Sequence, residues 1–383
     1  AASDVYKRQV PNRAISTFTI LSFMKQFLRK VHLWLSVPFG VFITLICLTG
    51  GLLIIEKDLI RRGDSSLVYV KPEGEPMEMS LLCSKVLETQ PEGAKISGVT
   101  IYPDPSKSYE VAIAPPYRKT IYVDPYRGEV LGAYERSAFF TTVSLIHRRM
   151  LDSTKEAVVG KQVVGVTVWA FVFILISGIV LWWPSRWSRL GRSLKIRFGR
   201  GRRVLWYDLH VVLGVFATLI LLGSAVTGLI WTYDWFEKPM YKLFGASQPS
   251  EKPPHASIQE IGDGYVAWGV AVKQIPLEKY ASLRVQKGVV KASLTGWGNA
   301  RATDDYRFDP VSGELQEVTK YADKERYEKV SGWISSIHLG RWGGTFSRLL
   351  TFLAMIIGAS LPITGYYLWW KRIYRPRKKR ELC

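Results

Sequence analysis

The chain has 383 residues, of which 48% are hydrophobic and 14 are Trp, yet its formal net charge is +20. A soluble nucleic-acid binder distributes its Lys and Arg over a folded surface, whereas the basic residues of this chain lie beside long uncharged runs. The composition therefore argues against a soluble protein and against a nucleic-acid partner. It favours a protein that contacts the lipid bilayer.

Four runs of more than 20 residues contain no charged residue. About 20 residues of helix cross the roughly 30 Å apolar core of a bilayer, and buried helices of soluble proteins are usually shorter and keep a polar face. We therefore predict four membrane-spanning helices, which lie within residues 33–55, 162–185, 209–233 and 349–370.

Basic residues cluster at one end of each run. Residues 25–30, the segment 185–203 and the tail after Trp370 are rich in Lys and Arg, and the only acid among them is Glu381. Because cytoplasmic loops carry an excess of cations, we predict that all three stretches and both termini are cytoplasmic. The first run lacks a small-residue cleavage site after it, which indicates an uncleaved anchor rather than a signal peptide.

This topology predicts the organisation of the whole chain. Met24 resembles a natural start, so residues 1–23 are expected to be non-native. The predicted segments are an N-terminal cytoplasmic segment (1–31), the first helix (32–56), an outer segment (57–140), an outer His segment with the second helix (141–185), a basic cytoplasmic loop (186–206), the third helix (207–236), a second outer segment (237–330), an outer His segment with the fourth helix (331–371) and a basic cytoplasmic tail (372–383).

An internal repeat organises these segments. His32 and His210 open the first and third runs, and a Thr-Gly pair follows each of them 17 residues later. The second and fourth runs both end in Leu-Trp-Trp, at residues 181–183 and 368–370, and a Gly stands three residues before each triplet. We therefore predict a mainly α membrane protein, in which a four-helix bundle is built from two repeats.

The two outer segments also share a motif. An extended stretch meets Asp-Pro-x-x-Gly-Glu at residues 124–129 and again at residues 309–314. Pro fixes φ and Gly accepts a positive φ, so this pattern is typical of a strand that enters a tight turn. Each outer segment is therefore predicted to be a small α+β unit that carries a hairpin.

Four of the five histidines occupy matching positions in the two repeats. His32 and His210 lie near the cytoplasm, and His147 and His338 precede the second and fourth runs on the outer side. A helix of 23 residues is about 35 Å long, so His32 at the cytoplasmic end cannot share a small ligand site with His147 at the outer end. The topology pairs His32 with His210, and His147 with His338. The fifth, His255, is interpreted as a surface residue.

A pair of histidines at each face of an apolar bundle is typical of haem. Haem iron takes axial ligands from facing helices, and the porphyrin fills an apolar slot. A single interfacial His is more often only hydrogen-bonded, but the matched placement of four favours two bis-His haems, since ionisable groups in a membrane protein are functional candidates. Zinc is less attractive, because two His leave its tetrahedral shell incomplete. The absence of Cys-x-x-Cys-His excludes covalent c-type attachment.

Other residues are candidates for contacts with the haem. Propionates would meet cations at the interface, and glycines after His210 and His338 would allow a planar ring to approach the backbone. The candidate cations are Lys30, Arg148, Arg149, Arg203 and Arg341, and the candidate glycines are Gly214, Gly340, Gly343 and Gly344.

Several of these motifs together resemble a known family. They are His32-x-x-Leu with Thr49-Gly50, the Asp-Pro-x-x-Gly-Glu stretch that ends at Glu129, the stretch 338–344, and Thr364-Gly-Tyr-Tyr-Leu-Trp-Trp. From about Met24 to the C-terminus, their order and duplication resemble the PepSY-associated transmembrane family. Within it the chain is similar to inner-membrane ferric-siderophore reductases of the ferrioxamine-reductase kind.

The resemblance implies PepSY-like periplasmic segments and an enzyme of the bacterial inner membrane. It implies two b-type haems with His32, His147, His210 and His338 as axial ligands, and electron delivery to ferric iron in a siderophore, which releases iron(II) for uptake. No motif identifies the siderophore or a catalytic residue. Because the chain lacks a Gly-x-Gly-x-x-Gly motif after a strand, the electrons are expected from a separate cytoplasmic donor or from a quinol.

Two other functions fit the same sequence. The first is a non-redox membrane module whose outer segments bind an extracytoplasmic partner while the histidines are structural. The second is a haem-bearing membrane subunit of a different oxidoreductase. A purified protein without haem absorbance would favour the non-redox module. A protein that has haem but does not reduce ferric chelates would favour the subunit of another oxidoreductase.

Overall fold

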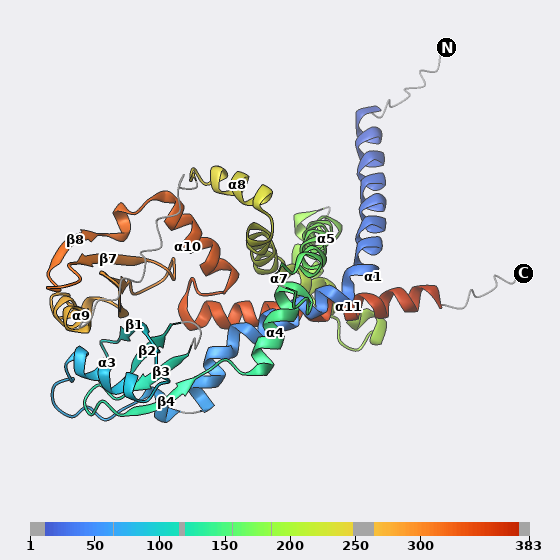
Figure 1. Ribbon diagram of the computed structural model, residues 1–383. Coiled ribbons are helices and arrows are strands. Elements are labelled where there is room, and N and C mark those ends of the chain that lie inside the picture. Colours follow the sequence, from blue (N-terminus) through green and yellow to red (C-terminus); the bar gives the residue numbers. More distant parts are fainter. Residues whose placement is uncertain are drawn as a thin grey trace, which may run out of the picture. The chain divides into compact units, whose positions relative to one another are not determined.

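The computed structural model describes residues 12–63, 65–114, 119–154, 156–184, 186–247 and 264–374 (Figure 1). Two compact units make up the chain. The helical unit comprises Ala1–Gly51, Ile146–Thr232 and Leu353–Cys383, and the sheet unit comprises Leu52–Leu145 and Tyr233–Phe352. Residues 1–11, the end of the tail from 375 to 383, and His255 lie outside the described residues.

Four long helices dominate the described chain: α1 (Asn12–Gly63), α5 (Val158–Trp182), α7 (Arg202–Thr232) and α11 (Gly344–Ile373). Each contains a stretch long and apolar enough to cross a membrane, and in α1 it runs from Phe23 to Glu56. Helices satisfy all their backbone polar groups internally, as the apolar core of a bilayer requires. The prediction of four spanning helices is confirmed, and the protein is a mainly helical, multi-pass membrane protein.

Close backbone approaches hold the helical unit together. A Cβ added to Gly358 of α11 would lie 3.0 Å from the Cys47 sulfur of α1 and 2.9 Å from Leu221 of α7. The Tyr366 hydroxyl of α11 donates to the Val37 carbonyl of α1 at 2.6 Å. Small residues and interhelical hydrogen bonds are the usual means of helix association in lipid, where no hydrophobic effect drives the helices together.

Shorter helices connect these elements. In the helical unit, η1 (Trp187–Arg189) and α6 (Leu190–Ser193) follow α5. In the sheet unit, α10 (Arg326–His338) precedes α11, and its last residue is a predicted ligand. The helix α4 (Ala138–Arg149) carries His147 near its C-terminal end. The remaining helices are α2 (Ser65–Val68), α3 (Met79–Glu88), α8 (Asp234–Leu243), α9 (Gly264–Lys273), η2 (Leu277–Lys279) and η3 (Tyr321–Asp323).

The sheet unit contains a single antiparallel sheet of eight strands (Figure 1). The first outer segment supplies β1 (Ile96–Ile101), β2 (Tyr109–Ile113), β3 (Thr120–Val123) and β4 (Val130–Tyr134). The second supplies β5 (Ser282–Gln286), β6 (Val289–Ser293), β7 (Thr303–Phe308) and β8 (Leu315–Thr319). Their order is β4-β3-β2-β1-β5-β6-β7-β8, and β1 pairs with β5 through Val99 and Val285.

Each outer segment supplies a helix and a hairpin as predicted, but the prediction that each forms a small unit of its own is wrong. Both segments contribute to one hydrophobic core, in which Leu82 of α3 and Ala271 of α9 lie with Val111 and Val290 of the sheet. The physical reason is that β1 and β5 would otherwise be exposed edges, whose unpaired backbone groups seek a partner strand. The alternation of apolar and polar residues within each segment does not reveal which edge strand of one segment pairs with which edge strand of the other.

The two predicted hairpin turns are confirmed. Between β3 and β4 the Gly128 N–H donates to the Asp124 carbonyl at 2.8 Å, and Gly128 has a φ of 68°. Between β7 and β8 the Gly313 N–H donates to the Asp309 carbonyl at 2.8 Å, and Gly313 has a φ of 78°. Glycine accepts this left-handed conformation without steric cost.

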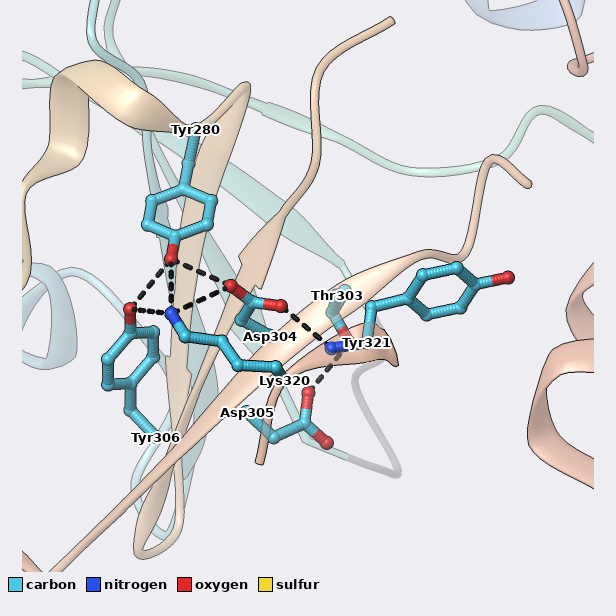
Figure 2. Close-up of polar contacts among 7 residues, drawn as sticks. All are labelled: Tyr280, Thr303, Asp304, Asp305, Tyr306, Lys320 and Tyr321. Carbon is cyan, nitrogen blue, oxygen red and sulfur yellow. Dashed lines mark hydrogen bonds and ion pairs between the residues drawn. The ribbon is translucent and has the colours of Figure 1, made fainter. Parts of the chain in front are cut away.

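A polar cluster ties the end of the sheet to the segment that leads into α10 (Figure 2). The buried Tyr280 hydroxyl donates to the Asp304 carboxylate at 2.9 Å, and the Lys320 ammonium donates to the same carboxylate at 3.0 Å. The second carboxylate oxygen accepts the backbone N–H of Tyr321 in η3 at 2.8 Å. Burial opposes ionisation of Asp304, but hydrogen bonds from Tyr321, Lys320 and Tyr280 hold its pKa below the usual value.

Candidate functional site

The helical unit contains a cavity of about 680 Å³, most of whose lining residues belong to α1, α5, α7 and α11. His32 of α1 and His210 of α7 both line it, so the structure brings together the two histidines that topology paired at the cytoplasmic side. Much of the remaining wall is apolar and includes Val37, Leu175 and Leu361. The cavity thus combines two imidazoles with an apolar slot.

A hydroxyl group orients each imidazole. His32 Nδ1 lies 2.9 Å from Ser177 Oγ, and His210 Nδ1 lies 2.8 Å from Thr364 Oγ1. Ser177 donates its own hydrogen to the Ile174 carbonyl, and Thr364 donates to the Leu361 carbonyl. A hydroxyl has only one hydrogen, so while that hydrogen is on the backbone carbonyl each hydroxyl accepts from its imidazole. In this arrangement Nδ1 carries the proton, and Nε2 keeps the lone pair that can bind a metal.

A glycine follows each of these hydroxyl residues and stands beside the imidazole. A Cβ added to Gly178 would lie 3.5 Å from Cε1 of His32, and one added to Gly365 would lie 3.7 Å from Cε1 of His210. The repeated Gly before Leu-Trp-Trp therefore keeps space open next to a ring. Gly214, which the sequence singled out, also lines the cavity.

One polar atom in the cavity wall has no partner. Ser36 lies one helical turn after His32 on α1, and its Oγ is buried without a hydrogen-bond partner among the described residues. Leaving a buried hydroxyl unsatisfied costs about 1–3 kcal/mol. An orphaned hydroxyl beside two oriented imidazoles fits a cavity that takes a ligand.

Four guanidinium groups belong to the cavity wall: Arg29, Arg197, Arg203 and Arg372. Only Arg203 was among the predicted cations, and Lys30 does not line the cavity. Helical spacing could have revealed Arg29, which precedes His32 by three residues, and Arg372, which follows Gly365 by seven. Residues at these separations share one face of a helix.

Arg197 could not be found in this way, because it lies in the irregular loop before α7. Its position depends on Asp208, a buried carboxylate two residues before His210. Asp208 accepts the Arg197 backbone N–H and its Nε at 2.9 Å each, and Nη2 at 2.6 Å. This bidentate contact fixes the guanidinium at the cavity.

His147 has a similar environment within the helical unit. Its Nδ1 donates to the Ile46 carbonyl at 3.0 Å and lies 3.3 Å from the Thr49 hydroxyl. A Cβ added to Gly50 would lie 3.0 Å from Cε1 of His147. The Thr-Gly pair that marked the sequence repeat thus has a physical role, since it orients an imidazole and leaves space beside it.

His338 is placed by a turn in the sheet unit. Gly340 has a φ of 64°, and a Cβ on it would lie 2.5 Å from the Thr351 hydroxyl. The Gly343 N–H donates to Ser347 Oγ at 2.7 Å, and Ser347 donates to the Gly340 carbonyl at 2.8 Å. Gly340 and Gly343 thus lie in the tight turn between α10 and α11, and their expected role in the approach of a planar ring stays a prediction.

The remaining predicted residues are spread over both units. His147 belongs to the helical unit and His338 to the sheet unit, so their pairing stays a prediction. Arg148 and Arg341 are exposed, and the Arg149 carbonyl packs against Gly160. Gly344 begins α11 with a φ of 60°. None of these residues lines the cavity that holds His32 and His210.

Comparison with known proteins identifies a family, although no curated protein matches the chain. The family described as PepSY-associated TM region matches residues 29–372, which is nearly the whole sequence, and the protein therefore belongs to this family.

Proposed function

We propose that the protein is a di-haem reductase of the bacterial inner membrane, which delivers electrons across the bilayer to ferric iron in a periplasmic siderophore complex. Fe(III) gains one electron and becomes Fe(II), which the siderophore binds more weakly and releases for uptake. The observation that carries this proposal is the pair of oriented imidazoles, His32 and His210, in one apolar cavity.

The cavity fits haem b by the chemistry of its walls. Haem, when bound, supplies one-electron chemistry at an iron that takes two axial ligands. His32 and His210 would hold that iron through Nε2, the nitrogen whose lone pair the hydroxyl contacts leave available. The volume of about 680 Å³, the orphaned Ser36 hydroxyl and the open space beside Gly178 and Gly365 support a large flat ligand.

The surrounding residues have separable roles in this proposal. Ser177 and Thr364 fix the tautomer and the rotation of the imidazoles, as outer partners of metal-bound histidines do. Arg29, Arg203 and Arg372 would bind the two propionates, because guanidinium groups pair with carboxylates in a bidentate manner.

The outer haem is proposed to bind His147 and His338. Support comes from the contacts of His147 with Thr49 and Ile46, which hold its Nδ1–H as Ser177 holds that of His32. Arg148, Arg149 and Arg341 remain the proposed contacts for the outer propionates.

The topology and the two-repeat plan are part of the same proposal. The basic segment after α5 and the tail after α11 favour a cytoplasmic position for both termini. The sheet unit would then face the periplasm as the PepSY-like part of the protein. A soluble cytoplasmic reductase or a quinol would supply the electrons, since the chain has no nucleotide-binding motif of its own.

Two measurements test the proposal. The purified protein should bind two haems per chain with low-spin spectra. When reduced by dithionite in anaerobic vesicles, it should convert a ferric trihydroxamate to Fe(II), which a coloured ferrous chelator captures. The His255→Ala variant, which changes the histidine left outside the proposed sites, serves as the control and should behave as the parent. A colourless protein would contradict the proposal.

The two other functions remain distinct outcomes of these measurements. A protein without haem would favour the non-redox module that binds an extracytoplasmic partner, and family membership alone is compatible with that function. A protein with two haems that leaves ferric chelates unchanged would favour a membrane subunit of another oxidoreductase.

A further inference from the structure

The loop between β6 and β7, residues 294–302, presents an indole ring outward; we name it the aromatic loop. Trp297 at its centre is 72% exposed, and Leu294 at its edge is 38% exposed. A single exposed apolar side chain is common on protein surfaces, so the surroundings of Trp297 decide whether it has a partner. The partner can be inferred from the elements against which the loop packs.

Hydrogen bonds to α10 and to the turn that follows it hold the backbone of the aromatic loop in place. The Gly298 N–H donates to the Trp342 carbonyl at 2.8 Å, and the Ala300 N–H donates to Ser336 Oγ at 2.8 Å. The Asn299 amide donates to the Lys329 carbonyl of α10 at 3.1 Å. The exposure of Trp297 is therefore a consequence of an ordered loop that directs its polar groups inward.

Trp297 lies next to the first turn of a membrane-spanning helix. Its ring stacks on Phe346 of α11, with the centroids 6.0 Å apart and the planes 28° apart, and it also contacts Trp342 edge to face. A Cβ added to Gly343 would lie 3.2 Å from the Trp297 ring. The indole thus stands at the level where α11 begins.

Phe346 is the first member of an exposed apolar stripe on α11. Leu349, Leu353 and Ile356 continue it at helical spacing, and all four side chains are 41–59% exposed. A stripe of this kind on a spanning helix faces lipid. Because Trp297 stacks on the first residue of the stripe, it extends the lipid-facing surface from α11 onto the aromatic loop.

We propose that the aromatic loop inserts Trp297 into the phospholipid headgroup region of the leaflet on the side of the sheet unit. Indole rings prefer this region, because an apolar body and a polar N–H both find partners there. The exposed Arg301 of the same loop is available to lipid phosphates. Through Asn299 and Ser336 the inserted loop would also fix α10, the helix that ends at His338, at a defined depth.

Site-directed labelling tests this contact without reference to haem. Trp297→Cys and Val311→Cys are each combined with Cys383→Ser, labelled with a nitroxide and reconstituted as the full chain in phosphatidylcholine and phosphatidylglycerol vesicles. Val311 is the matched control, since it is an apolar residue that is 81% exposed on the β7–β8 turn. The label at 297 should collide with oxygen from the bilayer far more than with a soluble nickel chelate, and the label at 311 should show the reverse.

Equal exposure of the two labels to the nickel chelate would overturn the proposal. So would immobilisation of the 297 label by a ferric trihydroxamate in detergent, because the loop would then be a substrate platform. A label-free variant covers the case in which Trp297→Cys fails to fold. Brominated lipids should quench the fluorescence of the parent more than that of Trp297→Phe, and identical quenching would contradict insertion.

Discussion

The polar cluster around Asp304 in the sheet unit and the polar groups of the cavity in the helical unit differ in how completely their hydrogen bonds are satisfied. In the sheet unit, Asp304 and its neighbours satisfy one another, so the cluster is complete as it stands. In the helical unit, the imidazoles of His32 and His210 are hydrogen-bonded through Nδ1, and the Ser36 hydroxyl beside them has no partner among the residues that the structure describes. A complete cluster indicates a structural role, whereas an incomplete one around a cavity indicates a ligand.

The largest effect is expected from filling the cavity. Gly178→Leu or Gly365→Leu would place a branched side chain beside an imidazole, where a Cβ alone already reaches van der Waals contact with His32 or His210. Either variant should lose the inner haem and keep the outer one, which absorbance per protein would measure. The matched control is Val166→Leu, which enlarges an exposed side chain on α5. Full haem content in both glycine variants would place the haem elsewhere.

A large loss of stability is expected from truncating the core that the two outer segments share. Leu283 of β5 is fully buried beside the β1–β5 junction. Leu283→Ala should destabilise the sheet unit by about 2–5 kcal/mol. Because the core is single, hydrogen exchange should accelerate in β2 as well as in β6. Acceleration confined to β6 would mean that the two halves fold independently.

The sequence predicts the four spanning helices and the two hairpin turns, but it does not predict that the two outer segments share one sheet. Uncharged runs longer than 20 residues specify spanning helices almost independently of context, and Asp-Pro-x-x-Gly specifies a turn locally. The pairing of β1 with β5 joins residues about 180 positions apart, and alternation of apolar residues carries no information about such a partner. The sequence did not identify Ser177 and Thr364 as partners of the imidazoles, because a hydroxyl in an apolar run has no distinctive pattern until its His is placed beside it.

A smaller effect is expected from removing the hydroxyl groups that orient the imidazoles. Ser177→Ala and Thr364→Val each delete the acceptor of an Nδ1–H while leaving the axial ligand in place. Outer partners of metal ligands typically contribute about 10–100-fold in affinity, so the inner haem should dissociate faster by that factor. Transfer of haem to apomyoglobin measures this rate. The control is Thr167→Val, which removes a buried hydroxyl on α5 that donates to the Val163 carbonyl. An equal effect there would indicate general destabilisation.

The smallest effect concerns pH and the sheet unit. The folded-state pKa of Asp304 lies below its usual value, so the carboxylate stabilises the fold at neutral pH and this contribution is lost as pH falls through the folded pKa. The melting temperature of the sheet unit should therefore fall more between pH 7 and pH 3 in the parent than in Asp304→Asn. If the melting temperature fell equally in both proteins, Asp304 would not be the cause of the acid sensitivity.

Haem content in the four single histidine variants tests the central claim most directly. His32→Ala and His210→Ala should each deplete the same haem, because either change removes half of its axial ligation, and the double variant should lose little more. His147→Ala and His338→Ala should deplete the other haem, and a change on each face together should remove both. The account would be contradicted if His32→Ala and His210→Ala depleted different haems, or if all four variants kept two low-spin haems.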